Sequence, residues 1–265
     1  MAFAQSLRNG NLRPIEGAVA TLGVSDRVDF LRKTYGLLGI SLIAFAAITA
    51  GMLKFMTATS LGFSKFAFEG RWNWLLVLGM FMVVGVVAQK LAMSQTSRGI
   101  QFAGLGVAVV AQAVLLQPML WVLMLRFGDP QSLVAGDDIA HAALTGDASR
   151  ILGEAVIITL AIFIGLTATV FVTKKDFSFM RGALMMASFG MLGMIIASAI
   201  FGFHLGALFT GFGILVLAGY VLYQTSMVMS QFPPTAFVAA ALMLFSTVAT
   251  LFWYVLQLLM ELNRR

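Results

Sequence analysis

The sequence lacks charge over a very long stretch, because no Asp, Glu, Lys or Arg lies between Gly182 and Met260. Only 11% of the 265 residues are charged and 60% are apolar, and the mean hydropathy is +0.95. A soluble domain carries about a quarter charged residues. Since a charge near the middle of a bilayer costs about 3 kcal/mol or more, this pattern is typical of a polytopic membrane protein. The same absence argues against a relay of buried acids for coupled transport.

Residues that metal sites and enzymes need are also scarce. There is no cysteine, which excludes disulfides and thiolate ligands, and His141 and His204 are the only histidines. No H-E-x-x-H, G-x-S-x-G or phosphate-binding P-loop pattern occurs. We therefore expect no enzyme activity, cofactor or metal centre, and we interpret His204 as a polar cap at a helix turn. The acidic group of Asp137, Asp138 and Asp147 matches no calcium loop and is expected to be solvated.

Seven apolar runs are long enough to cross a bilayer as helices, which need about 20 residues each. Breaks between them include Gly202–Gly206, which predicts a tight hairpin, and Pro233–Pro234, while Pro118 is expected to kink the third helix. The predicted domains are a polar tail at 1–33 and a seven-helix transmembrane region at 34–265. The predicted spans are 34–56, 72–93, 101–125, 151–173, 182–203, 205–229 and 235–260.

Basic residues lie at the ends of the apolar runs, so the net charge of +6 suits lipid headgroups and gives no indication of nucleic-acid binding. The positive-inside rule favours a cytoplasmic N-terminus by a modest margin. On that side lie the tail, Lys90, Arg98, Lys174, Lys175 and Arg181, and on the other lie Lys54, Lys65, Arg71, Arg126, Arg150, Arg264 and Arg265.

Polar residues inside the spans are the remaining candidates for function. The third span holds Gln112 and Gln117, the sixth holds Gln224, and the seventh holds Thr247 and Thr250. Such groups seek partners across helices, each pair contributing about 0.6–2 kcal/mol. A threonine can bond a carbonyl one turn back and remain silent, whereas the amide of Gln224 needs several partners.

Five segments together resemble the Bax inhibitor-1 family, in order and from about residue 29 to the end. The segment between the fourth and fifth spans resembles the family's T-K-x-D-F/L-S-F signature, and Leu116–Pro118 resembles its L-x-P element. The matching segments are Phe30–Leu38, Leu116–Pro118, Thr173–Phe179, Tyr220–Thr225 and Ala241–Leu256. The resemblance implies a bacterial member, in the cytoplasmic membrane, of an all-α fold whose seventh helix is surrounded by the other six.

The resemblance also implies where this sequence departs from its relatives. Family members carry two facing aspartates, in helices six and seven, that share a proton and act as a pH-sensitive latch on a cation leak path, typically for calcium. These positions fall at Gln224 and Thr247 here. Two close carboxylates titrate as a coupled pair, but an amide and a hydroxyl do not titrate in any relevant range. The two side chains are able to hydrogen-bond to each other but not to sense protons, and the sequence leaves open whether they touch. Thr250, Gln112 and Gln117 are the supporting polar groups.

Two functions remain open at this point. One is a leak path for calcium or other small cations that lacks the acid latch. The other is a non-conducting scaffold that binds and modulates a membrane protease or another membrane partner, with the tail at 1–33 as the natural contact. A carboxylate such as Glu154 or Asp176 beside the middle of the last helix would contradict the expectation of a neutral latch.

Overall fold

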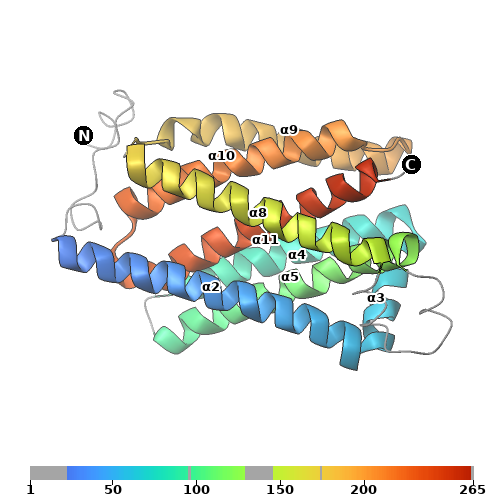
Figure 1. The fold of residues 1–265 in the computed structure, drawn as a ribbon, viewed down its shortest axis with the longest axis horizontal. Helices are drawn as coiled ribbons and strands as arrows, with labels where there is room; N and C mark the ends of the chain where they lie inside the picture. Colours follow the sequence, from blue (N-terminus) through green and yellow to red (C-terminus); the bar gives the residue numbers. More distant parts are fainter. Residues whose placement is uncertain (1–22, 95–96, 129–145, 174, 264–265) are drawn as a thin grey trace.

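The computed structural model describes residues 23–94, 97–128, 146–173 and 175–263, and it is a bundle of helices (Figure 1). Within these ranges, seven helices are long and apolar enough to cross a membrane. They are α2 (Val24–Phe55), α4 (Arg71–Ala92), α5 (Arg98–Phe127), α8 (Gly146–Thr173), α9 (Arg181–Phe201), α10 (Ala207–Gln231) and α11 (Phe237–Leu262). Three shorter elements join them: α3 (Thr57–Glu69), η2 (Ser178–Met180) and η3 (Pro234–Ala236).

The predicted spans coincide with these seven helices, and the clearest difference in their bounds is at the start of α2. This helix begins at Val24 rather than near residue 34, so part of the segment predicted as a polar tail is helical. Asp29 and Lys33 form an ion pair one turn apart there, and Phe30 is buried. The polar residues at the start of α2 therefore belong to a helix that continues beyond its apolar, membrane-spanning part. Most of the predicted tail, residues 1–22, lies outside the described residues.

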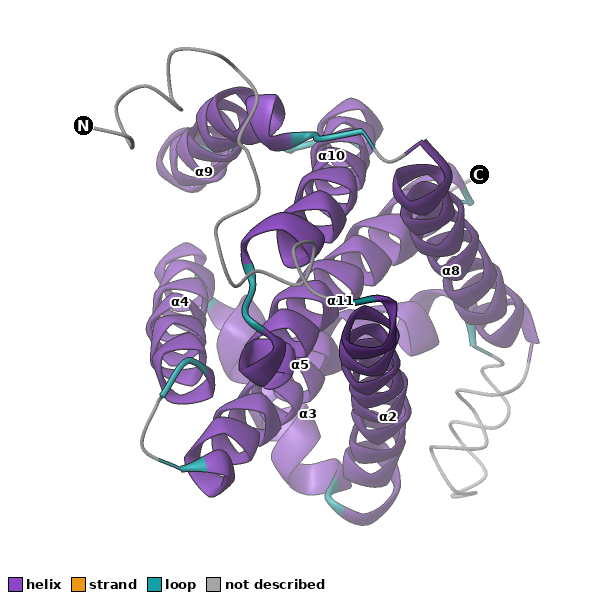
Figure 2. Cartoon of the chain, turned by 90° about the vertical axis from the view of Figure 1, so that its left-hand side faces the viewer, coloured by secondary structure: helices purple, strands orange, loops and turns teal. Residues whose placement is uncertain are grey.

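The last helix lies at the centre, as predicted. Of the residues in its apolar 18-residue stretch, 72% are buried. The helix packs against α2, α4, α5, α8 and α10. Figure 2 shows α11 in the middle of the bundle and α9 on the outside. The expectation that six helices surround it needs one correction, because α9 packs mainly against α10 and α4 and approaches α11 at Tyr254. Only 11% of the residues in the apolar stretch of α9 are buried.

The turns follow the expected backbone chemistry. Gly202 ends α9 in the left-handed conformation, with φ of 76°, which glycine adopts without strain. The tight connection to α10 is therefore confirmed. Pro118 lies within α5, which continues through it to Phe127. We refer to the end of the bundle where α2 begins as the N-terminal end and to the opposite end, where α11 finishes, as the C-terminal end.

Candidate functional site

The predicted pair of Gln224 and Thr247 is in direct contact. Gln224 comes from α10 and Thr247 from α11, and the Thr247 hydroxyl donates to Oε1 of Gln224 at 2.8 Å. The same hydroxyl lies 3.3 Å from the carbonyl oxygen of Met243, one turn back. Thr247 is only 7% exposed, so the contact is sheltered by the central helix. The arrangement joins α10 to α11 through a neutral hydrogen bond that cannot gain or lose a proton near neutral pH.

A cavity of about 500 Å³ lies toward the C-terminal end, between α4, α5, α9, α10 and α11. Two of the predicted supporting residues, Gln112 and Thr250, are in its wall. Thr250 bonds the carbonyl of Ser246 on its own helix at 2.8 Å. Thr250 lies about one helical turn from Thr247 along α11, and neither Thr247 nor Gln224 lines the cavity. The cavity therefore stops close to the hydrogen-bonded pair without including it.

Aromatic side chains that the sequence reasoning missed form much of this cavity. The rings of Trp74 and Trp253 stack with centroids 6.4 Å apart, and Tyr254 and Phe209 also contribute to the wall. His204, predicted as a polar cap, is exposed in the α9–α10 loop and lines the cavity as well. The available signal was a tryptophan in each of two spans, Trp74 near the start of α4 and Trp253 within α11, although their approach depends on how the helices pack.

A carboxylate lies close to the cavity at the end of α11. Gln257, which lines the cavity, donates through Nε2 to Glu261 at 3.2 Å. The Thr210 hydroxyl donates to the other oxygen of Glu261 at 3.3 Å. Glu261 lies just past the charge-free stretch of the sequence and was not among the predicted site residues. Glu261 places a carboxylate near the C-terminal end of the cavity.

Gln117 belongs to a different network. It is fully buried, and its Oε1 accepts from the Ser60 hydroxyl at 2.7 Å while Nε2 donates to the carbonyls of Thr49 and Ala113. The indole of Trp121 donates to the Ser60 hydroxyl at 2.9 Å. This network joins α5 to α3 and α2, so the hydrogen bonds of Gln117 do not involve Gln224 or Thr247.

The two carboxylates that could have contradicted a neutral latch lie elsewhere. Asp176, at the N-terminal end, accepts from the Ser226 hydroxyl of α10 at 3.0 Å and from the backbone N–H of Ser178 at 2.9 Å. Glu154 lies on α8 beside Arg150. Within the described part of the chain, the hydrogen bonds and ion pairs of these two carboxylates do not involve the middle of α11.

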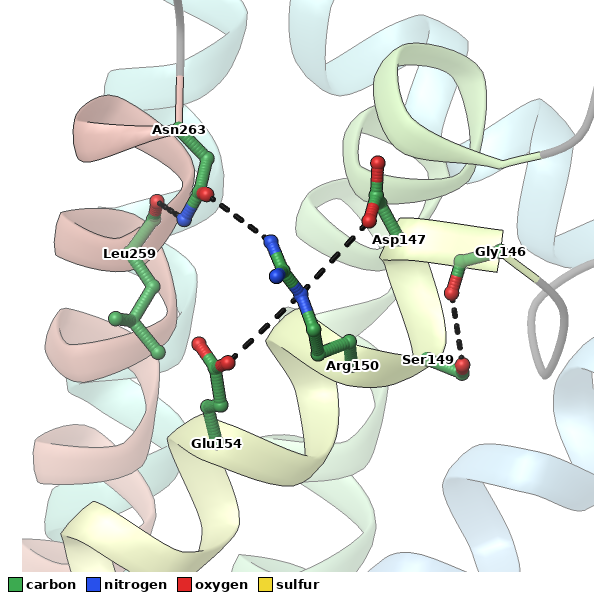
Figure 3. A network of polar contacts seen from close by, with 7 residues as sticks. All are labelled: Gly146, Asp147, Ser149, Arg150, Glu154, Leu259 and Asn263. Carbon is green, nitrogen blue, oxygen red and sulfur yellow. Dashed lines mark hydrogen bonds and ion pairs between the residues drawn. The ribbon is translucent and has the colours of Figure 1, made fainter.

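Arg150 is the centre of a polar network at the C-terminal end (Figure 3). Its guanidinium lies within 3.8 Å of Asp147 and Glu154 and donates to Asn263 at 3.5 Å. These long contacts between exposed groups contribute at most about 1 kcal/mol each. The pairing of Asp147 with Arg150 agrees with the expected solvated role of the acidic group, while Asp137, Asp138 and His141 lie outside the described residues.

We expect Asp176→Ala to destabilise the protein by about 1–2 kcal/mol, because the variant loses the hydrogen bonds that tie the connection between α8 and η2 to Ser226 of α10. A lower melting temperature in detergent and faster proteolysis after α8 would report this loss. Asp147→Ala is the matched control, since its carboxylate is exposed, and it should stay within about 0.5 kcal/mol of the wild type. Equal stability of the two variants would contradict a structural role for Asp176.

The fold and its apolar spans define a multi-pass integral membrane protein, all-helical over the described residues. The family model described as "Inhibitor of apoptosis-promoting Bax1" matches residues 138–264. A fission yeast protein named Bax inhibitor 1 is 29% identical over 246 residues, which cover 91% of this chain and 79% of that protein. The vaccinia virus Golgi anti-apoptotic protein is 25% identical, with 94% and 92% covered. Mouse protein lifeguard 4 is 24% identical, with 93% and 91% covered.

No solved structure matches the chain with statistical significance. The family match over residues 138–264 and the similarities along nearly the whole chain support membership of the Bax inhibitor-1 family. The resemblance drawn from short sequence segments is thereby confirmed.

Proposed function

We propose that the protein is a leak path for small cations, calcium among them, whose closure does not respond to protons. It is proposed to act in a bacterial cytoplasmic membrane with a cytoplasmic N-terminus, without enzyme activity. The observation that carries the proposal is the cavity of about 500 Å³, which ends near Thr250, one turn from the hydrogen-bonded pair of Gln224 and Thr247. In this proposal the cavity is the vestibule and the pair is the closure.

The chemistry of the closure supports a weak and constant leak. An interhelical hydrogen bond in a membrane contributes about 0.6–2 kcal/mol, so thermal motion breaks the contact often. Neither Gln224 nor Thr247 attracts a cation by charge, whereas Glu261 near the C-terminal end of the cavity does so from a distance. Entry of cations is then favoured at the C-terminal end of the cavity. No charged group in the described part of the chain assists their passage past Gln224 and Thr247 at any pH.

Calcium flux into dye-loaded proteoliposomes tests this proposal over the pH range in which carboxylate pairs titrate. We expect a flux above that of empty liposomes that does not change with pH. The double variant Gln224→Asp plus Thr247→Asp should gain a pH dependence, because two facing carboxylates raise each other's pKa and titrate in coupled steps. Thr250→Ser is the matched control, since it keeps a hydroxyl in the wall. A wild-type flux that follows a titration curve would contradict the proposal.

The alternative is a non-conducting scaffold that binds a membrane protease or another membrane partner. The position of α9 favours the scaffold. Only 11% of the residues in its apolar stretch are buried, which leaves a face free for a partner helix. Absence of cation flux at every pH would favour the scaffold. Retention of every co-purifying partner after deletion of residues 1–26 would count against the tail as the contact.

A further inference from the structure

A second cavity, of about 320 Å³, lies between α2, α5, α8 and α11 and is separate from the proposed vestibule. Figure 1 shows α11 between α8 and α2, which run across the same face of the bundle. Apart from two threonines, the side chains that line this cavity are apolar. At its floor lie Val248, Ala249 and Phe252 of the central helix.

This cavity opens sideways, toward the space that lipid occupies around the bundle. Near the N-terminal end, α2 and α8 are joined by the rings of Tyr35 and Phe171, whose centroids are 5.9 Å apart. The two helices contact each other little elsewhere. The rim residues Ala46, Val156 and Leu160 are exposed although they line the cavity. The cavity is therefore a crevice between α2 and α8 whose depth reaches α11.

Water is a poor occupant of this crevice. Its volume has room for about ten or more waters, each of which needs two to four polar partners. The wall offers the hydroxyls of Thr49 and Thr159, both buried and both without a hydrogen-bond partner among the described residues. An empty crevice would leave the apolar wall without packing contacts. The surrounding bilayer contains acyl chains at this depth, and an acyl chain is long, narrow and apolar like the crevice.

We propose that the crevice between α2 and α8 binds one acyl chain of a bilayer phospholipid. The chain enters between Ala46 and Leu160 and packs against Val248 and Ala249 of α11. Val248 directly follows Thr247, so the bound chain supports the central helix beside its hydrogen bond to Gln224. The inference concerns packing against α11 and stands whether or not the protein conducts ions.

Photocrosslinking in proteoliposomes tests the proposal, with a phosphatidylglycerol that carries a diazirine in the middle of one acyl chain. Ile43 and Ile157 are 72% and 70% exposed and should be labelled by any surrounding lipid. Val248 and Ala249 are 2% and 3% exposed and are reached only by a chain inside the crevice. We expect peptide mapping to find label on α11 at these residues. Label confined to the exposed isoleucines would overturn the proposal.

Substitutions at the rim sharpen the test. Ala46→Trp fills the entrance and should reduce the α11 label at least several-fold without changing the label at Ile43. Ala47→Trp is the matched control, because this neighbouring residue is exposed and does not line the crevice. Thr49→Val combined with Thr159→Val should retain the α11 label, since an acyl chain needs no hydroxyl. Loss of label in that double variant would overturn the acyl chain in favour of a polar ligand. If Ala46→Trp fails to fold, the wild-type labelling pattern still decides.

Discussion

Replacing Gly104 with alanine is expected to destabilise the bundle by about 1–3 kcal/mol. Gly104 is buried on α5, where the chain crosses α4 closely. An added Cβ would lie 2.6 Å from the carbonyl oxygen of Ala88 and 2.7 Å from the backbone nitrogen of Ala92. Because both atoms belong to helix backbone, no side-chain rotation relieves the clash, and α4 and α5 must separate.

Gly106 provides the matched control on the same helix. It is exposed, and an added Cβ there meets nothing within 4 Å. Gly106→Ala should therefore be neutral or stabilise by up to about 1 kcal/mol through helix propensity. Reversible unfolding of both variants in mixed micelles, followed by circular dichroism, measures the difference. A Gly104→Ala variant as stable as Gly106→Ala would show that the two helices do not pack this closely.

The seven spans could be predicted because lipid imposes a simple requirement on sequence. Each helix must be apolar over its length and must bond its own backbone, so the runs of hydrophobic residues give both number and position. The start of α2 could not be predicted in the same way. Asp26, Asp29 and Lys33 belong to the same helix, but their polarity indicates only that this part extends past the apolar stretch.

The short helix α3 was missed because it follows no transmembrane pattern. It has 13 residues and buries Ser60, Ser64 and Ala67, which are small rather than strongly apolar. Its position depends on the hydrogen bonds that Ser60 makes to α5. A contact between residues separated by 57 positions leaves no periodic signal in the sequence.

The candidate site was predictable only in part. The resemblance drew attention to Gln224 and Thr247 but left open whether they touch, and the structure shows that they do. The cavity beside it depends on helix packing, because its wall combines five helices and includes rings such as Trp74 and Trp253. Likewise, Asp176 was noted only as part of a signature. The structure shows that its carboxylate accepts a hydrogen bond from Ser226 and so holds the connection between α8 and η2 against α10.

Replacing Gln117 with leucine is expected to destabilise the protein by about 1–3 kcal/mol, the cost of breaking a buried polar network. The side chain is fully buried, and three of its hydrogen bonds reach α3, α2 and its own helix. Leucine has similar size but leaves the Ser60 hydroxyl without its acceptor on α5. Since Ser60 links α3 to the bundle, the loss should be concentrated there. Hydrogen exchange should become faster over Thr57–Glu69, alongside a lower melting temperature in detergent.

Gln112→Leu is the control for this prediction. Gln112 lies on the same helix and lines the cavity of about 500 Å³, and its side chain makes no hydrogen bond within the described part of the chain. The same substitution there should change stability by less than about 0.5 kcal/mol and leave exchange in α3 unaltered. It should instead affect any flux that passes through the cavity, which Gln117→Leu should alter only through loss of folded protein. One outcome would contradict this assignment: Gln117→Leu changes the cation flux while stability and hydrogen exchange in α3 stay at wild-type values. Gln117 would then line the cation path rather than hold α3 in place.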